Sequence, residues 1–171
     1  MLRPLFSRAL VGTLLLSSWS PGNAQGASPL LVRHLLPVEA AMKAASAAIV
    51  QCKAGGFEVA VAILDRDGTM RLLAASPAVI PISVEIAQRK ARASVMFQTS
   101  SADFGARVHA NPVFAASMQS VDPRLSGGAG ALPISARGEF LGAIGVSGAA
   151  QGAQDEDCAR AGLAAISDTL R

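Results

Sequence analysis

The sequence predicts an α+β domain in which helices pack on an antiparallel sheet. Its 171 residues suit about one domain, and 51% of them are hydrophobic although only 4% are aromatic. Two pairs of apolar segments are each joined by a short turn, which is typical of β-hairpins. Helical patterns stand before, between and after these hairpins, rather than alternating with single strands as in doubly wound nucleotide-binding folds. We therefore expect one layered domain with a core of small aliphatic side chains.

The N-terminal residues 1–24 are predicted to be a signal peptide. Two arginines precede an apolar run at residues 9–18, and small residues stand at Gly22 and Ala24, where a signal peptidase reads the chain. A run of about ten apolar residues is too short to span a bilayer, so no stable membrane span is expected after the leader is removed. The prediction is a periplasmic or secreted protein cleaved after Ala24.

Removal of the leader changes the charge balance of the protein. What remains is a flexible lead at residues 25–35 and a folded domain at residues 36–171, carrying 13 basic and 12 acidic residues. A nearly neutral domain lacks the electrostatic footprint of a nucleic-acid-binding protein. The short basic run at residues 89–92 is most simply the solvated face of a helix. Nucleic acid is therefore excluded as a predicted partner.

The first predicted helix begins near residue 38 and ends near Cys52. Its apolar residues recur with helical spacing and place Cys52 toward the core. They are Val38, Ala41, Met42, Ala45, Ala48, Ile49 and Cys52. The other cysteine, Cys158, opens the last helix, and if the two helices lie antiparallel on one side of the sheet, the sulfurs come close together. In an oxidising compartment this arrangement favours a disulfide, with two unpaired core thiols as the alternative.

The first hairpin is expected at residues 57–75. Residues 57–65 (FEVAVAILD) are rich in branched apolar side chains, as in a buried strand, and residues 66–68 (RDG) form the turn to a return strand at residues 69–75. Just before it, the AGG sequence at residues 54–56 is a helix C-cap signal in which a glycine adopts the left-handed conformation.

A long helix is predicted to follow the first hairpin. Ser83 is its expected N-cap, Glu85 lies at the positive end of its dipole, and Phe97 is near its end. Its apolar positions are Ile86, Ala87, Ala93, Met96 and Phe97. Two short helices are expected next, at residues 101–109 and 112–118.

The second hairpin and the last helix complete the predicted domain. A flexible loop at residues 126–130 (SGGAG) leads into strands at residues 131–136 and 139–148, joined by an Arg-Gly turn. The last helix is expected to begin near Gln154.

Three glycines recur in the final strand, at positions 142, 145 and 148. A phosphate-binding loop is excluded, because the next helix opens with three acidic residues, 155–157, that would repel an anion, and no Gly-Lys-Ser/Thr sequence is present. Strand alternation predicts that Gly142 and Gly148 point to one face and Gly145 to the other. Bare backbone there would admit a close neighbour: a packed helix, a second subunit or a flat ligand.

Four segments of the chain together resemble the GlcG/HbpS-like haem-binding family, whose relatives include the C-terminal domain of PduO-type proteins. They read VAVAILDRDG, AQRKA, LGAIGVSGA and DEDCARAGLAAI, and the resemblance extends over about residues 36–170. It implies a profilin-like fold with an antiparallel sheet between helices, assembly into a homo-oligomer, and haem as the possible cofactor. The chain departs from the family pattern at Ala93, where a hydroxyl is usual, at Ser101, where threonine is usual, and in the loop sequence GGAGALPI.

Few side chains in the sequence could ligate a haem iron. With no tyrosine in the chain, an axial ligand would be His109 beside the Asn-Pro pair or Met96 in the long helix. Alternatively, His109 is an exposed or capping residue and Met96 fills the core. His34, the other histidine, falls in the lead and is expected to be mobile.

Haem propionates and the ring edge would need polar partners as well. Arg89, Lys90 and Arg92 could meet the propionates if they rim a pocket, with solvated charges as the default. Ser101 is the remaining predicted cofactor contact. No metal other than a haem iron is expected.

Catalytic machinery is not evident in the sequence. GVSG lacks the spacing of a nucleophile elbow, and two histidines do not suffice for a metal-hydrolase cluster. Asp65 and Asp67 flank a turn, where aspartate serves turn formation. The prediction is an exported small-ligand-binding protein, with haem as the leading ligand and no catalytic residues. The alternatives are a redox or haem-processing accessory enzyme and a non-catalytic oligomeric interaction module.

Overall fold

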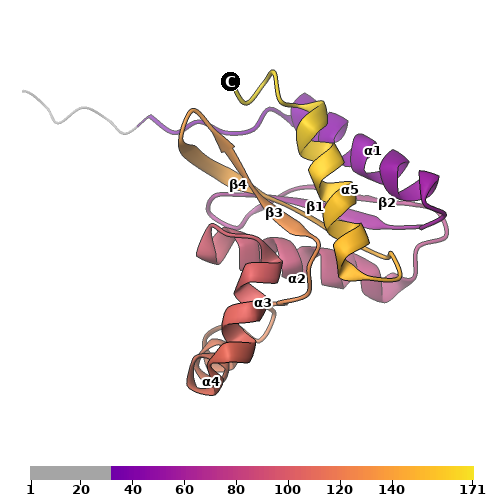
Figure 1. Ribbon diagram of the computed structural model, residues 1–171. Coiled ribbons are helices and arrows are strands. Elements are labelled where there is room, and N and C mark those ends of the chain that lie inside the picture. The colour runs from indigo at the N-terminus through magenta and orange to yellow at the C-terminus, as the bar shows by residue number, and fades with distance from the viewer. Residues whose placement is uncertain (1–31) are drawn as a thin grey trace, which may run out of the picture. The chain divides into compact units, whose positions relative to one another are not determined.

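Four antiparallel strands form one sheet between layers of helices (Figure 1). The order across the sheet is β2 (Met70–Ala75), β1 (Ala60–Asp65), β4 (Glu139–Ser147) and β3 (Ala131–Ala136). The computed structural model describes residues 32–171, so the predicted signal peptide lies outside the described residues. Within them, residues 33–171 form one compact unit. The element order and the antiparallel pairing confirm the predicted α+β class.

Helices cover both faces of the sheet. On one face, α1 (Val38–Ala54) and α5 (Gly152–Ala165) lie against each other, and α2 (Pro81–Phe97) covers the opposite face (Figure 1). The short helices α3 (Ser101–Ala110) and α4 (Pro112–Val121) follow α2 and connect it to β3. Among residues 32–171, we find no helix with the length and apolar character required to cross a membrane.

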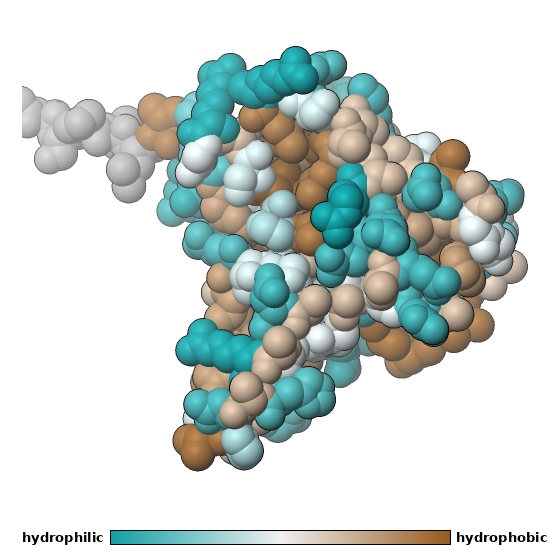
Figure 2. Space-filling model, viewed as in Figure 1, coloured by the Kyte–Doolittle hydropathy of each residue, from teal (hydrophilic) through white to brown (hydrophobic). Residues whose placement is uncertain are grey.

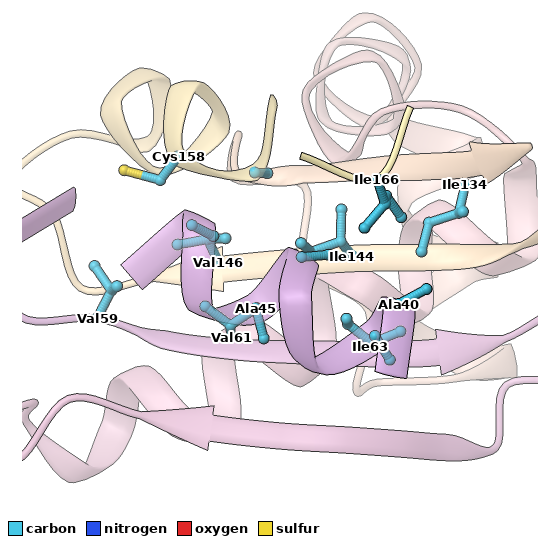
Figure 3. Close-up of a cluster of buried hydrophobic side chains, with 14 of the residues drawn as sticks. Ala40, Ala45, Val59, Val61, Ile63, Ile134, Ile144, Val146, Cys158 and Ile166 are labelled. Carbon is cyan, nitrogen blue, oxygen red and sulfur yellow. The ribbon is translucent and has the colours of Figure 1, made fainter. Parts of the chain in front are cut away.

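The larger core lies between the sheet and the pair α1 and α5 (Figure 3). Branched side chains of the two central strands, such as Ile63 and Ile144, pack against a row of alanines on α1. This row is Ala40, Ala41, Ala44, Ala45 and Ala48. The predicted stripe was wrong at Val38 and Met42, which are 53% and 50% exposed. The alanine face is buried instead, because small side chains let the helix axis approach the sheet and the neighbouring helix closely.

On the opposite face, Gly145 permits close packing of α2. A Cβ atom at this position would fall on the carbonyl oxygen of Ala87 and 2.9 Å from the Cβ of Ala91. Ala87 and Ala91 are themselves fully buried against Ala60 and Ala62 of β1. The close neighbour expected at Gly145 is therefore a packed helix.

At Gly142 and Gly148, the missing Cβ atom makes room for neighbouring backbone within the sheet, and not for a group packed on one of its faces. Their φ angles are +153° and +138°, values that disfavour any residue with a Cβ atom. Cβ atoms there would fall on the carbonyl oxygens of Leu64, near the end of the neighbouring strand β1, and of Glu58, just before that strand begins. The close neighbour at these two positions is a strand, so simple alternation did not describe them correctly.

Two helix starts differ from the sequence-based expectation. Helix α2 begins at Pro81 rather than after Ser83, since proline supplies a preset helical φ at the first position, and Ser83 is buried inside the helix. Helix α5 begins at Gly152, where Gln151 and Gln154 form a reciprocal capping box. At the end of α1, Gly56 takes the left-handed conformation with φ +81°, as predicted.

Candidate functional site

The two ends of the sheet are built differently. What we call the disulfide end comprises Cys52, Cys158, the pair Lys90 and Asp155, and the loop at residues 126–130. What we call the hairpin end comprises the turns of both hairpins, residues 33–37, and residues 169–171. The antiparallel register places both hairpin turns at the same end, because Asp65 pairs with Gly142.

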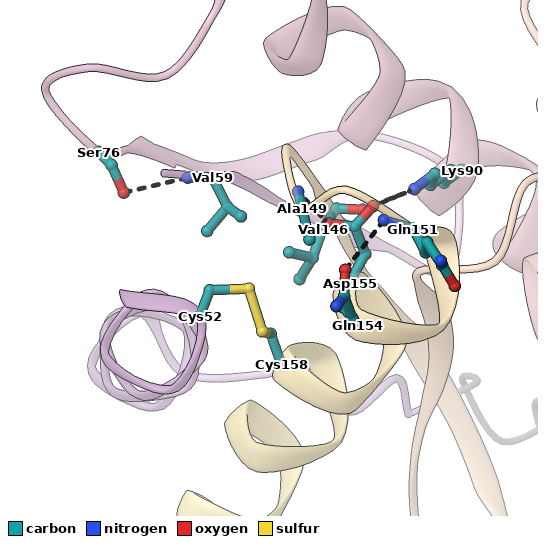
Figure 4. Close-up of a disulfide and its surroundings, with 10 residues drawn as sticks. All are labelled: Cys52, Val59, Ser76, Lys90, Val146, Ala149, Gln151, Gln154, Asp155 and Cys158. Atoms are coloured by element: carbon teal, nitrogen blue, oxygen red, sulfur yellow. Dashed lines mark hydrogen bonds and ion pairs between the residues drawn. A yellow bond between two sulfur atoms is a disulfide. The ribbon is translucent and has the colours of Figure 1, made fainter. Parts of the chain in front are cut away.

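A disulfide joins Cys52 at the end of α1 to Cys158 near the start of α5 (Figure 4). Their Cα atoms are 5.5 Å apart, and both residues are buried. The predicted bridge is therefore present, and the alternative of two unpaired thiols is excluded. The cross-link closes a loop with a sequence separation of 106 residues, which restricts the unfolded chain strongly.

Lys90 forms a buried ion pair with Asp155 beside this disulfide (Figure 4). The Lys90 ammonium donates to Asp155 Oδ2 at 2.7 Å and to the Val146 carbonyl at 3.2 Å. The other carboxylate oxygen of Asp155 accepts from the Ala149 backbone N–H at 2.9 Å. Lys90 and Asp155 are only 4% and 3% exposed, so Lys90 ties α2 to β4 and α5 and is not free to meet a ligand.

Ser101 holds the glycine-containing loop at the same end. Its hydroxyl donates to the Gly128 carbonyl at 2.7 Å and accepts from the Ala131 N–H at 2.9 Å, and the residue is fully buried. Gly130 lies so close to the Lys90 ammonium and to Asp155 that a Cβ atom would be within 2.8 Å of both. The sequence-predicted contacts Lys90 and Ser101 are thus brought together, as supports of one loop.

The two arginines predicted to meet propionates lie on the outer side of α2 and have acidic partners. Arg89 donates to Glu85 at 2.9 Å, one helical turn earlier. Arg92 lies 3.7 Å from Asp122 at the end of α4. The hydrogen bond from Arg124 lowers the pKa of Asp122, with smaller contributions from the charges of Arg124 and Arg92. Neither arginine belongs to the wall of the cavity between α3 and α4 or of the cavity at the hairpin end.

The two predicted axial ligands are exposed and lie on different helices. Met96 is 44% exposed on α2, so it does not fill the core, and His109 is exposed near the end of α3. A cavity of about 100 Å³ lies between α3 and α4, lined in part by Phe104 and Met118, and neither Met96 nor His109 contributes to its wall. The six residues predicted to bind cofactor therefore do not converge on one pocket.

A cavity with a volume of about 400 Å³ lies at the hairpin end. Its apolar wall is formed by Leu35, Leu36, Pro37, Ala136, Leu141 and Leu170. Its polar groups are His34, Glu139, Arg137, Thr169 and Arg171. Figure 2 shows apolar surface bordered by hydrophilic side chains at this end of the domain, where the chain terminates in Figure 1. The cavity is thus lined by an apolar wall with charged groups around it.

His34 is held in this cavity by a carboxylate. Its Nδ1 atom lies 2.6 Å from Glu139 Oε2, and the other oxygen of Glu139 accepts from Arg66 at 2.8 Å. The hydrogen bond with His34 lowers the pKa of Glu139, and the charges of His34 and Arg66 act in the same direction. Within residues 32–171 the Nε2 atom of His34 has no hydrogen-bond partner, and the side chain is 70% exposed.

This site has no signal in the sequence, because its parts are far apart in the chain. His34 and Glu139 are separated by 105 residues, and the histidine falls in a segment expected to be mobile. Within the described part of that segment, residues 32–35, His34 contacts Glu139, and Arg33 donates to Asp67 in the first hairpin turn at 2.9 Å. Since no local motif joins these residues, only the pairing of the strands could have revealed them.

The lining of this cavity is compatible with an organic ligand that carries an iron centre. Within residues 32–171, no three His, Cys, Asp or Glu side chains gather as a metal site would require. One imidazole with a free Nε2, an apolar wall and two arginines instead fit the needs of haem: an axial ligand, a macrocycle contact and propionate partners.

Comparison with known proteins gives consistent matches. The family model described as haem degrading protein HbpS-like matches residues 36–164. The crystal structure of HbpS is 34% identical, with a TM-score of 0.73, and the match covers 80% of this chain and 94% of that one. A double mutant of HbpS from Streptomyces reticuli is 32% identical, with a TM-score of 0.70, covering 82% and 97%. The PduOC:heme complex, 24% identical with a TM-score of 0.71 and covering 78% and 96%, shares the fold. The search of curated proteins found no match.

Proposed function

The chain belongs to the HbpS-like family, and from this premise we propose that it is an exported protein that binds haem. The observation that carries the proposal is the match to a family described by haem chemistry over residues 36–164, nearly the whole described domain. The amphipathic cavity at the hairpin end supports it, because its apolar wall, histidine and arginines are the groups that haem requires. Bound haem would supply a redox-active iron.

Either of the chain's two histidines could provide the axial ligand. His109, selected from the sequence, is exposed on α3 and accessible to a ligand. His34 lies in the cavity. Arg89 and Arg92 would contact propionates only by leaving their partners Glu85 and Asp122. Met96 is accessible as a sulfur ligand on the surface of α2.

A haem titration of the purified domain tests the proposal. We expect a Soret band that saturates at a fixed ratio of haem to protein. The band should be lost in His109→Ala if that residue is the ligand, whereas persistence of the band in this variant removes His109 and leaves haem binding in place. Absence of any spectral change in the wild-type protein at equimolar haem would contradict the proposal.

Export is proposed from the predicted signal peptide and is supported by the disulfide. Structural disulfides persist mainly in oxidising compartments such as the periplasm or the exterior of the cell. Expression of the full chain in a bacterium should yield a periplasmic or secreted product whose intact mass corresponds to a chain beginning at Gln25. A cytoplasmic product that retains residues 1–24 would contradict this part of the proposal.

Haem processing is a second candidate, favoured by the family's description as haem degrading. No nucleophile, acid–base pair or metal cluster in the described residues has been identified for it, so the iron itself would have to supply the chemistry. Incubation of the haem-loaded protein with a reductant and oxygen distinguishes the two functions. Loss of the Soret band with release of iron at a rate above that of free haem indicates degradation, and a stable band indicates binding alone.

We further propose that the protein acts as a homo-oligomer, either as a haem carrier or as an interaction module. Helix α4 has no buried residue, although its sequence PVFAASMQSV contains no charge, and Val113 and Val121 are 78% and 66% exposed. Exposed apolar helix faces of this kind commonly mark interfaces. Light scattering during size-exclusion chromatography measures the assembly, and Val113→Glu with Val121→Glu should dissociate it if α4 forms the contact.

A further inference from the structure

At the hairpin end, an imidazole, an apolar wall and two arginines meet in one cavity. We infer that this cavity is the haem site and that His34 Nε2 is the iron ligand, an inference that rests on the haem binding proposed above. This inference assigns iron binding to His34, which lies outside the segment that the family model matches, since that segment begins at residue 36.

The hydrogen bonding of His34 is that of a metal-binding imidazole. Metal-ligating histidines usually give their second nitrogen to a carboxylate, which fixes the tautomer and the ring orientation and raises the basicity of the ligand atom. Glu139 occupies this position at 2.6 Å from Nδ1. Arg66 holds Glu139 from the other side at 2.8 Å, so the carboxylate itself is oriented. The atom left free, Nε2, is the one that a haem iron would need.

The cavity also suits the rest of a haem molecule. Its volume of about 400 Å³ lies within the range of about 300–1,000 Å³ that small-molecule pockets occupy. Leu36, Leu141 and Leu170 offer apolar contact to a macrocycle. Arg137 and Arg171 stand at the same cavity. Arg137 Nε donates to the backbone carbonyl of Arg171 at 2.7 Å, and Arg171 lies 3.2 Å from the exposed carboxylate of Asp168, so carboxylate groups of a ligand would meet the remaining guanidinium N–H groups.

His109 lacks these features. It is exposed on α3 and belongs to the wall of neither cavity described above. A haem bound to His109 would have most of its macrocycle in water, whereas a haem at His34 would contact the leucine wall. The choice between the two histidines therefore leads to opposite expectations for the variants His34→Ala and His109→Ala.

The test compares ferric haem with metal-free protoporphyrin IX as ligands of the purified domain. His34→Ala should weaken haem binding by at least tenfold and shift the Soret band, while protoporphyrin affinity stays within about threefold, because only the iron bond is lost. Added imidazole should restore the haem spectrum of this variant. Glu139→Gln should weaken haem binding by about tenfold, as the loss of an orienting carboxylate typically does.

Two further variants separate the cavity from the iron bond and from the surface. Leu170→Glu should weaken both haem and protoporphyrin by tenfold or more, since it places a negative charge on the apolar wall. Arg160→Ala, a substitution on the exposed side of α5 at a side chain that is 63% exposed, should change neither. Circular dichroism and thermal melting confirm that each variant is folded.

The outcomes separate this inference from the proposed function. If the wild-type protein binds haem and His34→Ala retains both affinity and spectrum, the inference is overturned and haem binding stands. The same holds if His109→Ala removes the band and His34→Ala does not. If the wild-type protein binds neither ligand, the proposed function itself fails. Loss of the band in His34→Ala with rescue by imidazole supports the inference.

Discussion

The two ends of the sheet contain charged residues in opposite settings. At the disulfide end, the side chains of Lys90 and Asp155 are 6% and 4% exposed, and both make additional hydrogen bonds to the backbone. At the hairpin end, the side chains of His34 and Glu139 are 70% and 31% exposed, and His34 keeps one ring nitrogen free. A covalent bridge strengthens the first end, whereas ion pairs such as Arg33–Asp67 hold the second.

This difference separates residues that hold the fold from residues available to a ligand. A buried charge must be paired, because leaving it unpaired costs several kcal/mol, and burial also keeps the paired group away from a ligand. An exposed pair contributes roughly 0–1 kcal/mol and can rearrange around a ligand. Residue type alone did not make this distinction for Lys90, which the sequence suggested as a ligand contact and the structure places in the fold's support.

The largest effect is expected from removal of the disulfide. In a Cys52→Ala, Cys158→Ala variant, the free energy of unfolding should fall by up to about 4–5 kcal/mol, because a loop of this length gains much freedom in the unfolded chain. Guanidinium denaturation of the variant and of the oxidised wild-type protein measures the difference. A change in the free energy of unfolding below about 1 kcal/mol would mean that the disulfide contributes little to the stability of the disulfide end.

Breaking the buried ion pair should have the next largest effect. Lys90→Met leaves the Asp155 carboxylate buried without its partner, and the free energy of unfolding should fall by roughly 3–5 kcal/mol. The double variant Lys90→Met, Asp155→Leu should recover much of this loss, since no unpaired charge remains. His34→Ala is the matched control at the other end, and its destabilisation should be roughly 1 kcal/mol or less. Equal losses of stability in Lys90→Met and His34→Ala would contradict the distinction between a structural disulfide end and an accessible hairpin end.

A smaller effect is expected from filling the space between α2 and the sheet. Gly145→Ala should destabilise the protein by about 1–3 kcal/mol, because the added methyl group falls on the backbone of Ala87 and α2 must move outward. Gly128→Ala is the control: its nearest neighbour would be Lys90 Cε at 3.4 Å, an ordinary van der Waals contact. Thermal melting of both variants gives the comparison, and equal melting temperatures would show that α2 packing tolerates the methyl group.

Much of the fold could be predicted because its signals are local. The hairpins, the five helices and the side of α1 that carries Cys52 follow from periodicity and turn residues read within short windows. The disulfide also followed, since antiparallel helices on one face bring Cys52 and Cys158 together. The exposure of Met42 and Met96 did not follow, because periodicity does not say which part of an apolar stripe the sheet will cover.

The candidate site could not be predicted from the sequence, for a related reason. Its members come from three distant segments, around His34, Glu139 and Leu170, that meet only after both hairpins and the terminal helices have formed. The buried ion pair at the disulfide end is equally non-local, since Lys90 and Asp155 are 65 residues apart in the sequence. In each case the family resemblance suggested a type of ligand, but the geometry was needed to show which charged groups remain accessible.

The smallest effect concerns pH and the exposed pair at the hairpin end. Since the folded-state pKa of Glu139 is lowered, its ionised form stabilises the protein above the pKa of the unfolded chain, and this contribution is lost as pH falls through the folded value. The difference in free energy of unfolding between the wild-type protein and Glu139→Gln should therefore be constant between about pH 5 and 6 and shrink below about pH 4. Chemical denaturation of both proteins at about pH 3, 4, 5 and 6 measures this difference.

The background of His34→Ala identifies the cause of that pH dependence. Because the hydrogen bond with His34 is the largest contribution to the lowered pKa of Glu139, the same Gln substitution should show a weaker dependence on pH once His34 is removed. An unchanged profile would assign the effect to Arg66, the other partner of Glu139. The pair would then not orient the imidazole, and the hairpin end would lose the feature that most distinguishes it from the disulfide end.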